Sequence, residues 1–177
     1  MNLLQVIATT LLSLLLWVAP PALAARETDS YDGNIFALYA GDGALVPPHI
    51  SLAEALGQQR PVLLSFFLDD SAASKNFAPL LSDLQGRWGK VVEVIALPSD
   101  PYSVDPKAEA GDPSRYWRGT VPQLLVINSQ GEVLYDVDGL MDPAAIETAL
   151  SQATGLELSG AMGSSTSFNE INSGYGS

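Results

Sequence analysis

The feature that most restricts the fold is an apolar run of seven residues, Val62 to Leu68, interrupted by a single serine. Apolar side chains at both odd and even positions are typical of a strand that is buried on both faces. Apolar residues then recur at three- and four-residue spacing from Phe77 to Trp88, which predicts a helix soon after the strand. Because such a strand needs helices on both sides, we expect an α/β architecture.

The flanking segments extend this alternation of strands and helices. Strand-forming residues predict further strands at 34–40, 91–97, 123–127 and 132–137. Ser51 and Glu54 form a capping box that predicts a helix start, and Asp142, which precedes a proline, predicts another. A tight turn at 128–131 joins the last two strands in a hairpin. We therefore expect a mixed β-sheet flanked by helices, with parallel β-α-β units first and an antiparallel hairpin last.

Both ends of the chain differ in composition from its centre. Residues 1–24 contain an apolar run over 3–18 followed by a small-x-small sequence, which is typical of a cleaved signal peptide; a retained N-terminal membrane anchor is the alternative. In either case we expect the rest of the chain on the far side of a membrane. We expect a lead-in with the first strand at 25–49, the main domain at 50–157, and a flexible Gly/Ser-rich tail at 158–177.

Charge and cysteine content exclude several functions. The net charge is −12, and all eight Lys and Arg residues lie at or after Arg26. Such an acidic surface repels phosphate backbones, so we expect no nucleic-acid binding, although acidity also simply keeps a protein soluble. The chain has no cysteine, which excludes disulfides, a thiolate nucleophile and a zinc–thiolate site. We expect neither a metal nor a cofactor.

One motif after the apolar strand resembles the thioredoxin superfamily. The chain reads Asp70-Ser71-Ala72-Ala73-Ser74-Lys75 and then Ala78-Pro79, where the family has Trp-Cys-x-x-Cys-Lys followed by Ala-Pro in the helix. Val121-Pro122 precedes a predicted strand, where the family has a cis-proline. The resemblance implies a thioredoxin-like fold over roughly residues 50–155. It also places Ser71, Ala72, Ala73 and Ser74 at the positions of the redox motif.

The resemblance implies that the redox chemistry itself is lost. Disulfide exchange needs a thiolate of lowered pKa and a second thiol, which serine hydroxyls cannot replace. The family's tryptophan is Asp70 here, and its buried acid on the preceding strand is Ser65. A serine nucleophile would need a nearby base, but the single histidine, His49, lies in a Pro-rich connector. We therefore expect no enzymatic activity, with Ser71 acting as a helix cap.

Asp69 and Asp70 form a carboxylate pair beside the start of the predicted helix. Such a pair would suit metal binding or acid–base chemistry. The simpler interpretation, which we favour, is that the helix dipole stabilises negative charge at this end.

Pro122 is a feature of the resemblance that still permits a function. In thioredoxins the edge beside the cis-proline pairs with extended peptides through main-chain hydrogen bonds, which need no cysteine. The resemblance implies a surface for a protein partner. Its members would be the 71–74 motif with Asp70, Trp117, Thr120, Val121 and Pro122. The alternative is that Pro122 is present only because the fold requires it.

Two further segments are similar to a narrower family. Residues 31–41 (YDGNIFALYAG) and 167–172 (SFNEIN) resemble cyanobacterial thioredoxin-like proteins described as thylakoid-membrane photosystem I accumulation factors. The resemblance implies a protein of the thylakoid lumen or membrane that supports photosystem I assembly, with photosystem I subunits or assembly intermediates as partners. Residues 3–18 would provide the contact with the membrane. The alternative is a general peptide-binding, chaperone-like module of the lumen or periplasm.

The second of these segments carries an apolar pair, Phe168 and Ile171, three residues apart in a polar surrounding. This pattern is typical of a short segment that folds onto a partner or back onto its own domain. An incidental pair of hydrophobic residues in a disordered tail is the alternative.

Overall fold

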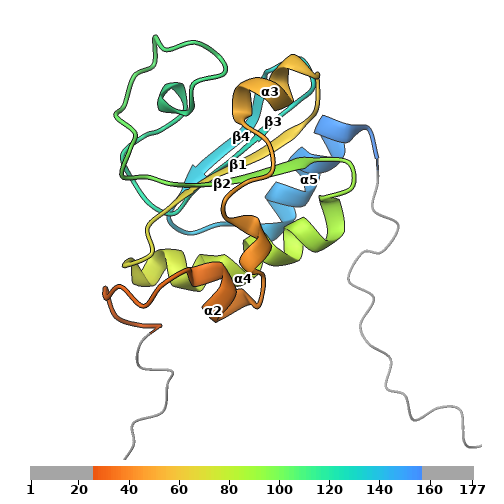
Figure 1. Ribbon diagram of the computed structural model, residues 1–177. Coiled ribbons are helices and arrows are strands. Elements are labelled where there is room, and N and C mark those ends of the chain that lie inside the picture. Colours follow the sequence, from red (N-terminus) through yellow and green to blue (C-terminus); the bar gives the residue numbers. More distant parts are fainter. Residues whose placement is uncertain (1–25, 157–177) are drawn as a thin grey trace, which may run out of the picture.

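The apolar run forms β1 (Val62–Phe67), a central strand whose six residues are all buried. The computed structural model describes residues 26–156. β1 lies between β2 (Glu93–Pro98), which is parallel to it, and β3 (Gln123–Ile127), which is antiparallel. β4 (Val133–Asp138) pairs antiparallel with β3, so the strand order is β2-β1-β3-β4 (Figure 1). The predicted mixed sheet of the α/β class is confirmed.

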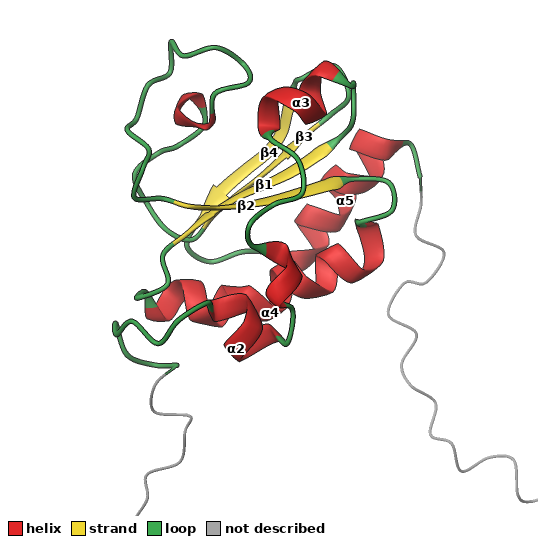
Figure 2. Cartoon of the chain, in the orientation of Figure 1, coloured by secondary structure: helices red, strands yellow, loops and turns green. Residues whose placement is uncertain are grey.

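Helices cover both faces of this sheet (Figure 2). One face carries α2 (Ile35–Ala40), α4 (Ala72–Trp88) and α5 (Pro143–Thr154). The opposite face carries α3 (Leu52–Gly57) and the 3-10 turn η3 (Pro113–Arg115), while the 3-10 turn η2 (Gly43–Leu45) follows α2. Within residues 26–156, no helix combines the length and the apolar character that a membrane span requires.

The predicted helix starts are confirmed by side-chain caps. The Ser51 hydroxyl accepts a hydrogen bond from the Glu54 N–H at 3.2 Å, and the Asp142 carboxylate accepts one from the Ala144 N–H at 3.0 Å. Each bond satisfies an N–H group that has no partner inside its helix. Gly155 closes α5 in the left-handed conformation, with φ of 70°.

The strand predicted at 34–40 is wrong, because these residues form helix α2. The Asn34 side chain accepts hydrogen bonds from the N–H groups of Phe36 and Ala37, and Gly41 ends the helix with φ of 67°. The two cap residues therefore outweigh the strand-forming side chains between them. Phe36 packs edge-on against Phe67 of β1, with ring centroids 4.9 Å apart. The lead-in thus joins the helical layer and adds no strand to the sheet.

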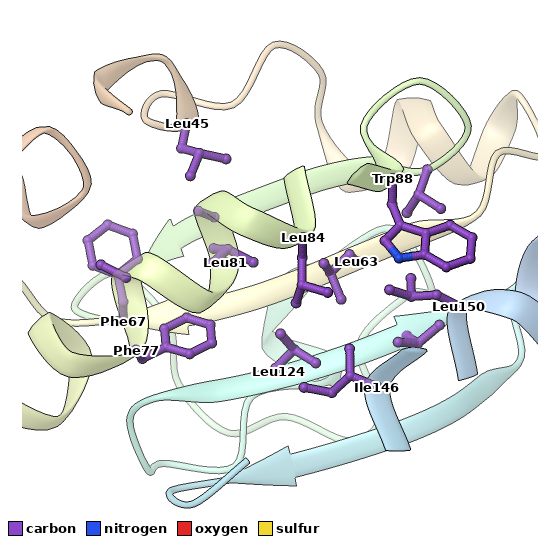
Figure 3. Packing of buried hydrophobic residues seen from close by; sticks show 14 of the residues in the cluster. Leu45, Leu63, Phe67, Phe77, Leu81, Leu84, Trp88, Leu124, Ile146 and Leu150 are labelled. Carbon is purple, nitrogen blue, oxygen red and sulfur yellow. The ribbon is translucent and has the colours of Figure 1, made fainter. Parts of the chain in front are cut away.

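Two apolar clusters, one on each face of the sheet, hold the layers together. The larger lies between β1, β3, α4 and α5 (Figure 3), and its fully buried members include Leu63, Leu81, Leu84, Trp88, Leu124 and Leu150. The indole N–H of Trp88 donates to Glu147 at 2.8 Å, which satisfies the one polar atom of that side chain. The second cluster joins α3 to the other face through Leu52, Leu64, Phe66 and Trp117. Both faces of β1 are therefore covered, as its composition predicted.

Candidate functional site

Ser71 and Ser74, which stand at the two cysteine positions, lie where β1 passes into α4. The Ser71 hydroxyl accepts a hydrogen bond from the Ser74 N–H at 3.3 Å, which confirms Ser71 as the helix cap. Ser74 is fully buried, and its hydroxyl accepts from the Leu68 N–H at 3.1 Å. Both hydroxyls therefore stabilise the strand–helix junction. His49, the only histidine, is exposed in the 46–50 connector.

Residues 26–34, which we call the strap, cross the N-terminal end of α4. The Asp29 carboxylate accepts a hydrogen bond from the Ala72 N–H at 2.8 Å, and the Arg26 guanidinium donates to the Asn76 carbonyl at 3.4 Å. The N-terminus of a helix offers free N–H groups and a positive partial charge, which a carboxylate stabilises. Asp29 of the same chain therefore binds the Ala72 N–H, a group that a ligand could otherwise bind.

Lys75 of α4 holds the strap through hydrogen bonds, and its side chain is fully buried. Its ammonium donates to the carbonyls of Ser30 at 2.6 Å and Thr28 at 2.9 Å, and to the Asp32 carboxylate at 2.5 Å. The hydrogen bond from Lys75 lowers the pKa of Asp32 below its usual value, and the Tyr39 hydroxyl adds a second bond at 2.8 Å. The buried charge is therefore paired and hydrogen-bonded, as burial of an ammonium demands.

Asp69 also has a structural role, because its carboxylate accepts a hydrogen bond from the Ile35 N–H at 3.2 Å. Burial is the main cause that raises its pKa above the usual value, with the nearby Asp70 and Asp100 adding to the effect. The bond ties the start of α2 to the end of β1. Within residues 26–156, no three acidic or histidine side chains lie close enough together to hold a metal ion.

Asp69→Asn is expected to raise the stability of the folded chain slightly at pH 7. A group whose folded pKa is raised contributes stability below its unfolded pKa and loses it as the pH rises through the folded value. Asparagine keeps the oxygen that accepts from Ile35 but carries no charge. Thermal unfolding from pH 3 to 8 should show the gain near neutrality and none at pH 3. Asp70→Asn, which removes an exposed neighbouring charge, is the control; an equal gain there would contradict the role of burial.

An apolar groove of about 470 Å³ lies beside the strap and the serine motif. Its lining residues are Ala73, Asn76, Phe77, Leu80, Pro122, Gly139, Leu140 and Met141. One wall is thus the first half of α4, and the other combines Pro122 with the turn that follows β4. The Gly139 N–H donates to the Pro122 carbonyl at 2.9 Å, which holds these two parts of the second wall together. Leu140 is 96% exposed at the rim.

The structure brings part of the predicted docking surface together at this groove. The Val121–Pro122 peptide bond is cis, as the resemblance implied, and Pro122 and Ala73 line opposite walls. The other predicted docking residues differ in exposure: Asp70 and Thr120 are exposed, Val121 is half-buried, and Trp117 is buried. Trp117 packs on Phe66 in the core, with ring centroids 5.0 Å apart. Little of its ring is therefore available to a partner.

Sequence reasoning missed Lys75 as a clamp and four apolar members of the groove, namely Phe77, Leu80, Leu140 and Met141. The helical spacing of Phe77 and Leu80 predicted burial in the core and gave no sign of a groove. Leu140 and Met141 carried a usable signal, since two large apolar residues in a short polar connector are unusual. For Lys75, no local pattern links it to Asp32, which lies 43 positions earlier.

A curated relative supports the resemblance found in the motifs. The thylakoid membrane protein slr1796 of Synechocystis sp. is 36% identical to this chain over 129 residues. The chain contains no cysteine and is similar in sequence to this thylakoid protein. The alignment covers 73% of the chain and 64% of the relative, so the chain spans just under two thirds of the relative's length. No protein-family model matches the chain.

Among solved structures, a mutant thioredoxin from Halobacterium salinarum NRC-1 is similar at a TM-score of 0.46 and 21% identity. The match covers 60% of this chain and 85% of that thioredoxin. The thioredoxin-like assignment rests on the features of the chain itself: the strand order β2-β1-β3-β4, the helix α4 directly after β1, and the cis-proline before β3.

Proposed function

We propose that this chain is a non-catalytic docking protein that supports photosystem I accumulation on the lumenal side of the thylakoid membrane. The observation that carries the proposal is the apolar groove beside cis-Pro122 in a chain without cysteine. The similarity to a thylakoid membrane protein supports the location, and the resemblance of residues 31–41 and 167–172 to photosystem I accumulation factors supports the role. Photosystem I subunits or their assembly intermediates are the proposed partners.

The groove suits an extended segment that carries one or two apolar side chains. Leu80 and Met141, which are half-buried, supply apolar surface, and Leu140 at the rim is free to cover an inserted side chain. Burying one large apolar side chain contributes about 1.5–3 kcal/mol, so groove binding alone is weak and reversible. Without a thiol, no mixed disulfide forms, and the partner leaves by dissociation. The net charge of −12 adds attraction for a basic partner.

The test combines a deletion strain with one rim variant. Loss of the chain is expected to lower the amount of photosystem I, and the wild-type chain should restore it. Leu140→Asp places a charge at the groove rim, where the side chain is 96% exposed and the fold is not at risk. It should reduce partner capture at least tenfold and fail to restore photosystem I. Leu156→Asp, a change of the same chemistry at the far end of α5, is the matched control and should behave as wild type.

The outcomes separate the role from the site. Unchanged photosystem I in the deletion strain would overturn the proposed role. Full restoration by Leu140→Asp would show that the groove is not where the partner binds. The general chaperone-like alternative draws on the same apolar lining, which places no charged side chain in the groove. It predicts that the wild-type chain, but not Leu140→Asp, suppresses aggregation of an unrelated unfolded protein.

A further inference from the structure

We propose that this chain's own C-terminal segment, residues 165–172, occupies the apolar groove when no partner is bound, with Phe168 and Ile171 as its apolar contacts. These residues lie outside the described range, and the inference rests on the docking role given to the groove in the proposed function. The segment would act as an internal competitor that a partner must displace.

The chemistry of the two surfaces is complementary. Of the eight residues that line the groove, Asn76 alone has a polar side chain, so an occupant must present apolar groups. Segment 165–172 presents two large apolar side chains among Ser, Thr, Asn and Glu residues. The occupant that we propose differs from an extended partner in forming one helical turn on binding, in which residues three positions apart lie on the same side and Phe168 and Ile171 enter the groove together.

The position of the chain end makes the contact geometrically accessible. Met141 lines the groove two positions before α5 begins, and α5 has 12 residues. At 1.5 Å per residue the helix carries the chain about 18 Å from the groove before the described part ends at Leu156. Phe168 follows 12 positions later in a Gly/Ser-rich sequence. A Gly/Ser-rich chain of that length has a root-mean-square span of about 19 Å, which matches the distance to be covered.

This match favours the chain's own segment over a second copy. A linker whose mean span equals the separation of two sites gives an effective concentration in the mM range. The segment is therefore held at a local concentration roughly a thousandfold above a protein at μM concentration. Even a contact with a dissociation constant of about 1 mM would then be occupied about half of the time within one molecule.

The lack of native cysteine gives a direct test, because two introduced cysteines are then the only thiols. Asn76→Cys places a thiol on an exposed groove residue, and Asn169→Cys places one between Phe168 and Ile171 without removing either. Intramolecular disulfide formation is measured by gel mobility and peptide mass at low μM concentration. The matched control is Lys90→Cys with Asn169→Cys. Lys90 is exposed just beyond α4, three positions after Arg87, whose ion pair with Glu147 joins α4 to α5.

The groove pair is expected to form its disulfide at least tenfold faster than the control pair. Adding Phe168→Ser and Ile171→Ser to the groove pair should lower its rate to that of the control. Equal rates for the two pairs, or a rate that does not depend on Phe168 and Ile171, would overturn the inference. Disulfides formed only between molecules would also overturn it and would indicate a second copy as the occupant.

A second measurement separates this inference from the proposed function. The full chain with Phe168→Ser and Ile171→Ser should bind the partner two- to tenfold more tightly, because the competitor is gone. If the disulfide assay fails while Leu140→Asp still prevents restoration of photosystem I, the inference is wrong and the proposed function stands. If the disulfide forms as expected but the deletion strain keeps its photosystem I, the proposed function is wrong and the inference stands.

Discussion

Lys75→Met is expected to release the strap, residues 26–34, from α4 and to lower the free energy of unfolding by about 2–4 kcal/mol. Methionine keeps the buried stem of the lysine but cannot donate hydrogen bonds. The carbonyls of Thr28 and Ser30 and the carboxylate of Asp32 then lose the group that holds them against the helix. The Asp32 carboxylate keeps its bond from the Tyr39 hydroxyl, but the strap loses the buried donor that holds it, which favours its movement into water.

The measurement combines denaturant unfolding with hydrogen exchange over the strap. Lys90→Met, which removes an exposed lysine just beyond α4, is the control and should change stability by less than about 0.5 kcal/mol. Exchange in residues 28–34 should rise in Lys75→Met and stay unchanged in the control. Equal stability and equal exchange in the two variants would show that the Lys75 contacts do not hold the strap.

Acid pH provides a second check on the same contact. The pKa of Asp32 is lowered in the folded chain, chiefly by the hydrogen bond from Lys75. A group with a lowered folded pKa contributes stability above its unfolded pKa and loses it as the pH falls through the folded value. The unfolded pKa of an aspartate is about 3.9, so the contribution of Asp32 is complete near neutrality and fades below about pH 4. The stability difference between wild type and Lys75→Met should therefore narrow at low pH.

Local sequence patterns predicted the elements whose formation depends on local contacts. The composition of Val62–Leu68 was enough to place the central strand, because burial on both faces demands apolar residues at every position. Ser51, Ser71 and Asp142 were recognised as caps because a cap acts within three residues of its own position. The strand predicted at 34–40 was wrong because the prediction followed the strand-forming side chains. It did not treat Asn34 and Gly41 as the caps of a short helix.

Local sequence patterns predicted less of the candidate site, because its contacts join residues that are far apart in the chain. Pro122 was identified through the resemblance. The helical spacing of Phe77 and Leu80 predicted burial in the core, where Phe77 does lie, but it gave no sign that both also line a groove. An apolar stripe along a helix predicts that the stripe is buried, but it does not show which residues of the stripe the sheet covers and which stay open to a groove. The strap depends on Asp29 and Asp32, two of many acidic residues, and their role appears only when the lead-in is placed against α4.

Ser65→Asp is expected to lower the free energy of unfolding by more than about 3 kcal/mol, because it places a carboxylate in an apolar core. Ser65 is fully buried on β1, on the α4 side between Leu63 and Phe67. Its hydroxyl has no hydrogen-bond partner among the residues that the structure describes. Ser65→Ala removes that unsatisfied group, so it should leave stability unchanged or raise it by up to about 1 kcal/mol.

Denaturant unfolding of the two variants at pH 7 and pH 4 distinguishes a buried charge from simple overpacking. If charge is the cause, the deficit of Ser65→Asp should shrink at pH 4, because a buried carboxyl is readily protonated. Ser65→Asn, which has nearly the same shape without the charge, should show a smaller deficit that does not vary with pH. A Ser65→Asp variant as stable as wild type at pH 7 would contradict the expectation.

Restoring the two thiols alone is not expected to restore thioredoxin chemistry to this chain. At the helix start, the Ser74 hydroxyl is bonded to Leu68 and the Ala72 N–H is taken by Asp29. Sulfur is a weak acceptor, so a thiol at position 74 would hold that bond less well. The Ser65 hydroxyl has no hydrogen-bond partner among the described residues that a carboxylate at this position could take over. We therefore expect Ser71→Cys with Ser74→Cys to leave the chain inactive in an insulin-reduction assay, with or without Ser65→Asp. Substantial reductase activity in either variant would show that the site lacks thiols and nothing else.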